Sequence, residues 1–311
     1  MELFRIRNVD FMRWRWHAIV LSTIVNLIGI GSFVFEGLNF GLDFTGGTIV
    51  EVGYEHPVEL AQVRSALASG GFEAGTVQNF GSLKDVMIRL PPMSRQGGAD
   101  LSDRLYKALS HSADGKVELR RVEFVGPQVG QELAEDGFLA VFYALIGILI
   151  YVWMRFEWRL SLGAIIATIH DTIVTVAVFS LFRIEFDLTV LAAVLAVIGY
   201  SLNDTIVIFD RIRENFRKVR KGSVLEIVNL SINETMSRTI ITSGTTLMVV
   251  VALYLFGGPL IHGFALALIV GIMTGTYSSI YVATASAVML GISRADLAVP
   301  KKEVDEFQSG P

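Results

Sequence analysis

The chain has 311 residues, of which 52% are hydrophobic and 18% are charged, and its formal net charge at pH 7 is −4. Soluble domains carry about 25% charged residues, so this composition, with a mean hydropathy of +0.54, is typical of a chain that needs lipid as its solvent. The small negative charge gives no overall basic field, and we expect no nucleic-acid partner. The absence of cysteine excludes disulfides, thiolate metal sites and a cysteine nucleophile.

Six segments are apolar and close to the roughly 20 residues that a membrane-spanning helix needs. The first has the basic start of a signal peptide, but its apolar run is too long and 36–38 offers no clean cleavage site, so we expect an uncleaved anchor. A Gly-Gly-Pro turn at 257–259 separates the last two. The predicted spans are 17–35, 138–154, 161–182, 188–209, 239–256 and a sixth from 260 to about 292.

Lysine and arginine predict the orientation, because both are enriched in short cytoplasmic loops. Sixteen of the 26 basic residues flank one side of the predicted spans, whereas Arg183 is alone in the short loops of the other side. We therefore predict a cytoplasmic N-terminus and first helix over 1–37, an extracytoplasmic domain over 38–131, five further helices over 132–292 with a cytoplasmic loop at 210–238, and a cytoplasmic tail over 293–311.

The segment 38–131 is predicted to form one small α+β domain. Apolar and polar residues alternate over 48–54, and further strands are predicted at 74–80, 86–90 and 117–125. Helical spacing occurs over 58–68 and 99–110, and Arg95–Gly98 is predicted to be an exposed loop. The order β-α-β-β-α-β is the ferredoxin-like pattern. The fold class is therefore an α-helical integral membrane protein with six transmembrane helices and one ferredoxin-like domain.

Ionisable groups within the spans are the candidate functional residues, because such groups are costly in a bilayer. They are His170 and Asp171 in the third span and Asp204, beside Asn203, in the fourth. Arg238 lies at the predicted cytoplasmic start of the fifth. A buried carboxylate is tolerated when it is protonated or paired with a cation. A carboxylate and an arginine that can meet and separate would form a switchable proton site.

Each of these residues also has a structural interpretation. Arg238 can extend its side chain to the membrane surface, and His170 with Asp171 can be a static pair that packs two helices. Asp204 can be a hydrogen-bonded packing residue. Asp210, next to several arginines, is predicted to be the solvated end of its helix.

Two further patterns bear on packing and chemistry. Gly271 and Gly275 form a GxxxG pair in the sixth span, which favours close helix packing. No Walker motif, histidine-rich metal site or Ser-His-Asp order occurs, so we expect no catalytic residue, no metal, no cofactor and no ATP hydrolysis in this chain.

Four motifs together resemble the SecD/SecF family. The sequence GLDFTGG at 41–47 is similar to its G-x-D-F-x-G-G signature, and FVGPQVG at 124–130, followed by Glu132 and Leu133, is similar to its second signature. IGYSLNDTIVIFDRIREN at 198–215 and Ser-Arg-Thr at 237–239 resemble the fourth and fifth helices of SecF members. The layout of six helices with one large loop matches over nearly the whole chain.

The resemblance implies a role in bacterial protein export at the inner membrane. Family members of this type pair with SecD in a twelve-helix unit of the RND superfamily, associate with the SecYEG channel and use the proton-motive force to help complete translocation of the exported preprotein. SecA, which hydrolyses ATP, is an indirect partner, and YajC is a further one. Asp204 and Arg238 match positions of proton-pathway residues, and Asn203, Asp171 and His170 join them as candidates.

We expect the glycine-rich motif to be structural rather than catalytic. Gly46 and Gly47 permit tight backbone turns where the chain leaves the membrane, and Asp43 is predicted to cap that turn. Gly126 and Pro127 belong to the second structural motif.

Two other functions stay open from the sequence. An RND-type exporter of lipids or small solutes would normally have twelve helices in one chain and larger paired loops. A non-transporting membrane assembly factor would have no need of Asp204 and Arg238 within the membrane.

Overall fold

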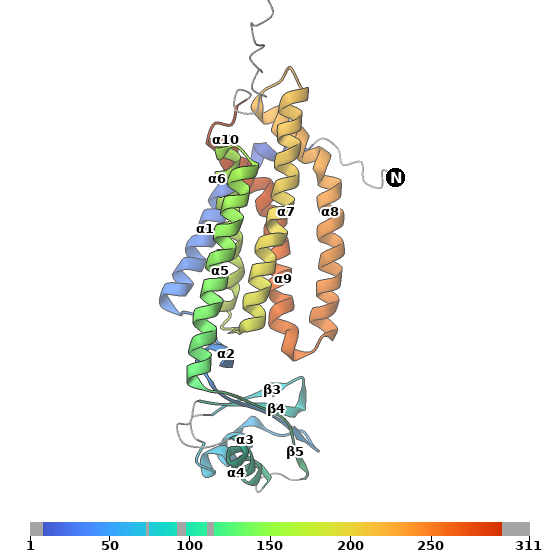
Figure 1. Cartoon of the computed structure of the whole chain (residues 1–311). Coiled ribbons are helices and arrows are strands. Elements are labelled where there is room, and N and C mark those ends of the chain that lie inside the picture. Colours follow the sequence, from blue (N-terminus) through green and yellow to red (C-terminus); the bar gives the residue numbers. More distant parts are fainter. Residues whose placement is uncertain (1–8, 73–74, 92–97, 111–114, 294–311) are drawn as a thin grey trace, which may run out of the picture.

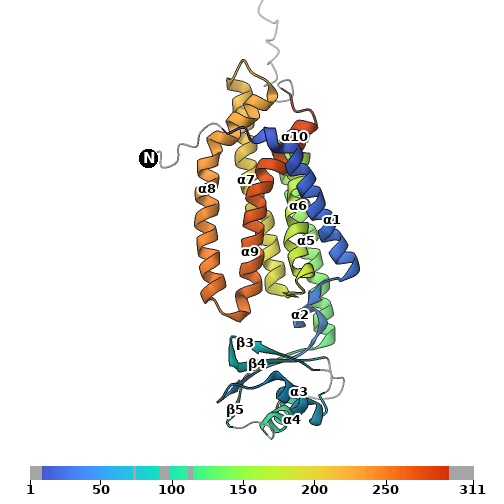
Figure 2. The ribbon, with the colours of Figure 1, turned by 180° about the vertical axis from the view of Figure 1, so that it is seen from behind.

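The computed structural model describes residues 9–72, 75–91, 98–110 and 115–293. It consists of a helical bundle with a small sheet-containing domain at one end (Figures 1 and 2). Of the predicted loop Arg95–Gly98, residues 95–97 lie outside the described residues, whereas Gly98 begins a helix. The predicted tail lies outside the described residues from residue 294 onward.

The six predicted spans are confirmed as six helices that are long and apolar enough to cross a membrane. The last of them is interrupted by a π-helical turn, η2, a feature that is frequent at functional sites. The elements are η1 (Phe11–Trp14), α1 (Arg15–Phe35), α5 (Pro127–Arg155), α6 (Trp158–Leu181), α7 (Leu188–Lys218), α8 (Val224–Phe256), α9 (Pro259–Ser278), η2 (Ser279–Ala283) and α10 (Thr284–Met289).

The segment 210–238, predicted as a loop, is mostly helical. Helix α7 continues through Lys218 and α8 begins at Val224, so that only 219–223 connects them. The prediction was wrong because it treated the end of the apolar run as the end of the helix. The polar turns are stabilised instead by a capping box between Ser223 and Glu226 and by an ion pair from Arg211 to Glu234, whose nearest atoms are 2.7 Å apart.

The small domain has the predicted β-α-β-β-α-β order. Its elements are β2 (Gly47–Tyr54), α3 (Leu60–Ser69), β3 (Thr76–Phe80), β4 (Ser82–Leu90), α4 (Gly98–Ser110) and β5 (Val117–Val125). The antiparallel sheet has the order β3-β4-β2-β5 and confirms the ferredoxin-like prediction. The sheet lies between the bundle and the two helices α3 and α4, which form the far end of the molecule (Figures 1 and 2).

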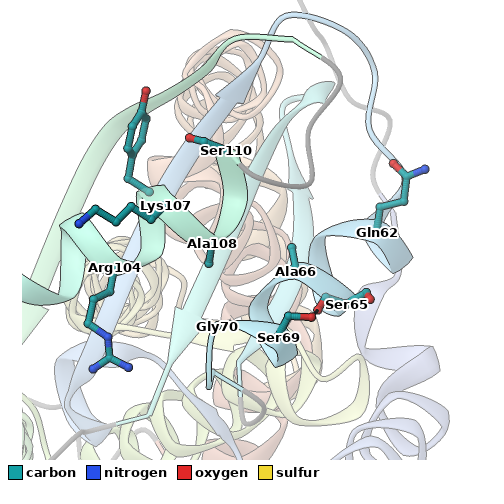
Figure 3. A pocket seen from close by; sticks show the side chains of 10 residues that line it. Gln62, Ser65, Ala66, Ser69, Gly70, Arg104, Lys107, Ala108 and Ser110 are labelled. Carbon is teal, nitrogen blue, oxygen red and sulfur yellow. Dashed lines mark hydrogen bonds between the residues drawn. The ribbon is translucent and has the colours of Figure 1, made fainter.

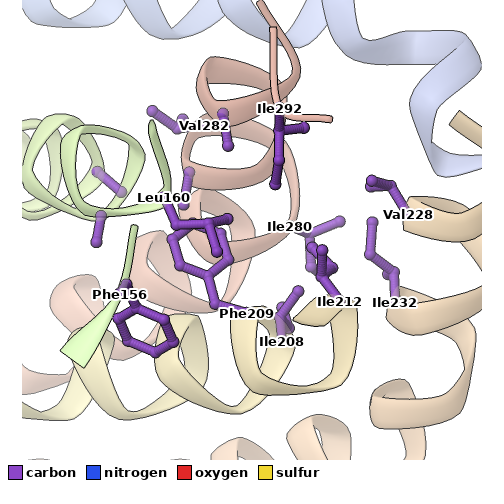
Figure 4. Packing of buried hydrophobic residues seen from close by; sticks show 14 of the residues in the cluster. Phe156, Leu160, Ile208, Phe209, Ile212, Val228, Ile232, Ile280, Val282 and Ile292 are labelled. Carbon is purple, nitrogen blue, oxygen red and sulfur yellow. The ribbon is translucent and has the colours of Figure 1, made fainter. Parts of the chain in front are cut away.

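Helix α7 lies at the centre of the bundle, whereas α1, α5 and α8 expose apolar side chains along much of their length. At the end of the bundle remote from the small domain, aromatic and branched side chains from α5, α6, α7, α8 and η2 form a continuous core (Figure 4). Phe156 and Phe209 meet there edge to face, with ring centroids 5.7 Å apart. This core fixes α7 against its neighbours.

The GxxxG pair packs α9 against α7, as the sequence predicts. A Cβ atom on Gly271 would lie 2.1 Å from Val197, and one on Gly275 would lie 2.8 Å from Ser201. Real Cβ atoms do not approach other atoms so closely, and the two helices therefore need glycine at both positions.

We predict that Gly271→Ala destabilises the protein by about 1–3 kcal/mol, the usual range for overpacking a tight contact. The matched control is Gly244→Ala in α8, where an added Cβ would meet nothing within 4 Å. Thermal unfolding in detergent should show a lowered midpoint for Gly271→Ala and no loss for the control. Equal stability of the two variants would contradict the close α7–α9 contact.

Candidate functional site

The bundle encloses two carboxylates with different surroundings. Asp171 of α6 is fully buried, and its Oδ1 lies 2.9 Å from Nδ1 of His170. Its Oδ2 accepts hydrogen bonds from the hydroxyl of Ser278, at 2.6 Å, and from that of Ser201. Both oxygens of Asp171 are therefore engaged by groups from α6, α7 and α9.

Asp204 of α7 is also buried, with 3% of its surface exposed, but its carboxylate accepts fewer hydrogen bonds than that of Asp171. Within the described residues its one hydrogen bond comes from the Ser243 hydroxyl of α8, at 3.3 Å. Ser243 in turn accepts hydrogen bonds from Thr276 of α9, at 2.8 Å, and from Tyr200, at 3.4 Å. Asp204 thus lies where three helices meet, with a single long hydrogen bond to satisfy it.

The predicted partner of Asp204 forms no ion pair with it. Arg238 lies on α8 with its side chain exposed, close enough for its charge to act on the Asp204 carboxylate, but no ion pair joins the two among the residues that the structure describes. Asn203 is exposed as well, because successive residues of a helix point in different directions and Asp204 takes the inward one. The structure therefore separates the five predicted residues into a His170–Asp171 pair, a buried Asp204, and two exposed side chains.

The glycine-rich motif forms the junction between the bundle and the small domain. Gly46 and Gly47 have φ angles of 68° and 130°, which favour glycine, as the sequence predicts. Asp43 lies in the short helix α2 (Leu42–Thr45), but it does not cap that turn. Its Oδ2 accepts a hydrogen bond from the backbone N–H of Leu188, at 3.0 Å, and so caps the start of α7.

The second motif packs against the first. Pro127 is the first residue of α5, where a missing N–H carries no penalty. A Cβ on Gly130 would lie 2.9 Å from the backbone nitrogen of Gly46, so the two motifs touch through their backbones. The backbone angles of Gly126 are ordinary, and an added Cβ there would meet its nearest neighbour only at 4.0 Å.

A contact that the sequence analysis missed strengthens this junction. Strand β1 (Asn39–Phe40) pairs in parallel with β6 (Glu185–Phe186) of the α6–α7 connection. Arg89 of β4 forms an ion pair with Glu185. Two-residue strands carry too little alternation to be recognised in a sequence.

Two surface features complete the set of candidates. Asp210 pairs with Arg155 at 2.8 Å while 39% of its side chain stays exposed, so it is partly solvated as predicted. It is not a helix end, because α7 continues through Lys218. The small domain has a hollow of about 1010 Å³ between α3 and α4, at the far end from the bundle (Figure 3). Arg104 and Lys107 are the charged residues among its described lining, which otherwise consists of Gln62, Ser65, Ala66, Ser69, Gly70, Tyr106, Ala108 and Ser110.

A six-span bundle with carboxylates in its interior and one ferredoxin-like domain defines a class of polytopic membrane protein built to hold ionisable groups within the bilayer. Residues 105–293 match the family model "Protein export membrane protein SecD/SecF, C-terminal", and residues 31–58 match "SecD/SecF GG Motif". The chain belongs to the SecD/SecF family.

Its relatives include SecF subunits of the protein translocase. The SecF of Vibrio alginolyticus is 54% identical over 98% of both chains. That of Escherichia coli O157:H7 is 50% identical, over 94% of this chain and 91% of its own. Together with the six apolar helices, this relationship identifies a multi-pass protein of the bacterial inner membrane.

The fold also matches a crystal structure of SecDF, a translocon-associated membrane protein from Thermus thermophilus. The TM-score is 0.82 at 35% identity, over 92% of this chain. A second form of SecDF, described as super-membrane-facing, matches with a TM-score of 0.68. This chain spans 39% of the SecDF chain, so a SecD-related partner is expected to supply further parts of the assembly.

We predict that Asp43→Ala lowers stability by about 1 kcal/mol, as the loss of a helix cap does. Asp187→Ala is the matched comparison, because Asp187 caps the same helix through the N–H of Val190 at 2.8 Å. Thermal unfolding should give both variants similar midpoints, below that of the unaltered protein. An unchanged midpoint in Asp43→Ala would contradict the capping role.

Proposed function

We propose that this chain is the proton-responsive subunit of a Sec protein translocase, which works with SecD to draw on the proton-motive force while a preprotein completes its passage. The observation that carries the proposal is the environment of Asp204, a buried carboxylate with a single long hydrogen bond. A residue kept only for packing would be expected to have both oxygens satisfied, as those of Asp171 are.

Protonation of Asp204 would change which arrangement of helices is most stable. The neutral acid is tolerated in the present arrangement, whereas the ionised form needs a cation or water nearby. Arg238 is the candidate cation, because it lies on α8, the helix that also provides Ser243. A proton that enters and leaves can therefore shift the balance between two arrangements. The transmembrane potential supplies roughly 2.3 kcal/mol per charge per 100 mV.

Of the two helices that carry Asp204 and Arg238, α8 is the better suited to move. In its most apolar stretch 17% of the residues are buried within the chain, compared with 50% for α7. A displacement of α8 that brings Arg238 toward Asp204 therefore disturbs fewer internal contacts than a displacement of α7. Such a displacement would mainly break the hydrogen bonds of Ser243, which link Asp204 to Thr276.

SecD is the proposed partner within the membrane, and the SecYEG channel, SecA and YajC are further proposed components of the translocase. The excess of basic residues on one side supports cytoplasmic termini and a small domain on the opposite side of the membrane. From there the domain can contact the emerging polypeptide, and the hollow lies between α3 and α4, at the end of the domain away from the bundle (Figures 1 and 3).

We predict that Asp204→Asn abolishes the stimulation of export by a proton gradient while assembly with SecD persists, because asparagine keeps the shape and the hydrogen bond but cannot titrate. The measurement is export into membrane vesicles with and without a gradient. Asp210→Asn is the control and should respond normally, since Asp210 is partly solvated and already paired with Arg155.

A full response of Asp204→Asn to the gradient would overturn the proposal and leave Asp204 as a packing residue. Arg238→Lys refines the test, because lysine keeps the charge but loses the planar fork that binds a carboxylate through two bonds. A defect in Arg238→Lys would indicate that the geometry of the pair matters as well as its charge.

We also predict that a photo-crosslinking residue at position 107, in the hollow of the small domain, captures a stalled exported chain. Leu83 is the control position, because it is 64% exposed but does not line the hollow. Capture from position 107 well above that from position 83 is the expected result. Equal or absent capture at both positions would contradict contact through this surface.

A further inference from the structure

A groove on the side of the bundle opposite α8 gives access to the His170–Asp171 pair. It has a volume of about 310 Å³ and lies between α1 and α6, in the half of α1 remote from the small domain. Its walls include several isoleucines, but Ser22, Thr23 and Asn26 of α1 line it together with His170 of α6. Hydrogen-bonding side chains therefore line part of an otherwise apolar groove.

We propose that water enters this groove and that His170 passes protons between that water and Asp171, which gives the chain a second proton-carrying position besides Asp204. The inference rests on the proposed function, since it concerns the same use of the proton gradient.

The geometry suits a relay through the imidazole ring. Nδ1 of His170 faces Oδ1 of Asp171 at 2.9 Å, while the same side chain forms part of the groove wall. A proton taken up from water at Nε2 can be matched by release of the Nδ1 proton to the carboxylate, so that the ring ends neutral and Asp171 is protonated. No other reactant is needed.

The neighbours of His170 leave it few other proton partners. Its side chain interacts with two titratable groups among the described residues, Asp171 and Tyr277, and the Tyr277 ring centroid lies 6.3 Å from that of His170. The Tyr277 hydroxyl is already bonded to α1, through the Ala18 carbonyl at 2.9 Å and Ser22 at 3.1 Å. The parts of α1, η2 and α10 that line the groove contribute no charged side chain.

Water is favoured over a lipid chain as the occupant of the groove. Oδ1 of Asn26 is buried beside it and has no hydrogen-bond donor among the described residues. Buried polar atoms normally have a partner. A water molecule in the groove can supply this donor when the Asn26 side chain turns toward it, whereas an acyl chain cannot.

Helix α7 joins the two carboxylates. Ser201 donates to Asp171, and Asp204 follows it by three residues, which is about one helical turn. A change in the protonation of Asp171 therefore acts on the same stretch of α7 that carries Asp204. Because Gly275 packs directly on Ser201, that stretch cannot shift without α9.

The absence of native cysteine allows a direct test of water access. Asn26→Cys and Thr23→Cys should react with a water-soluble thiol reagent in membrane vesicles. Leu27→Cys, at nearly the same depth on α1 but 63% exposed outside the groove, should react far more slowly. Reaction at positions 23 and 26 no faster than at position 27 would show a dry groove and overturn the inference.

The relay itself is tested with His170→Asn, whose side-chain amide can still donate to Asp171 but cannot pass a proton. We expect its gradient-dependent export to fall to the level measured without a gradient, at unchanged thermal stability and unchanged labelling of position 26. A full response would overturn the relay. If Asp204→Asn loses its response while His170→Asn keeps it, this inference fails and the proposed function stands; if Asp204→Asn keeps its response, the proposed function fails.

Discussion

Helices α7 and α9 touch through Gly271 and Gly275, and the polar interior of the bundle depends on that contact. The approach leaves no room for a side chain larger than hydrogen. It brings Ser201 and Ser278 onto the same oxygen of Asp171 and sets Thr276 beside Ser243, the hydrogen-bond donor to Asp204. In a bilayer, where apolar side chains gain little by meeting each other, small residues and interhelical hydrogen bonds are what hold helices together. The glycine contact and the serine bonds therefore support each other.

The two carboxylates differ in how completely the protein replaces water around them. Asp171 has a partner at each oxygen, whereas Asp204 has one long bond from a hydroxyl that also accepts from two other groups. An ionised Asp204 is therefore stabilised less by the surrounding groups than an ionised Asp171 is. Its possible cation, Arg238, lies on α8, whose most apolar stretch is largely exposed at the surface of the chain. The hydrogen bond from Leu188 to Asp43 connects the start of α7 to the junction with the small domain. A movement of α7 can therefore be transmitted directly to that domain, and the reverse.

The sequence was most informative where periodicity was strong. Alternation over 48–54 and helical spacing at 60, 63 and 67 were enough to predict the small domain, because its core is built from one face of each element. The prediction of a loop at 210–238 was wrong, because hydropathy marks only where the apolar run ends, whereas α7 continues beyond that point. The β1–β6 pairing and the bond from Asp43 to Leu188 join residues far apart in the chain, which periodicity cannot reveal. Burial of Asp204 was predictable from its place in an apolar run, but the exposure of Asn203 and Arg238 depends on how α7 and α8 are turned.

The central claim is that Asp204 changes its protonation during the working cycle. Infrared difference spectroscopy of the chain, reconstituted with its SecD partner, measures this directly through the carbonyl stretch of a protonated carboxyl group. We predict that a band of this kind changes when a proton gradient is applied, that the change is absent in Asp204→Asn, and that it persists in Asp210→Asn. An unaltered band change in Asp204→Asn, or no change in the unmodified protein, would contradict the account.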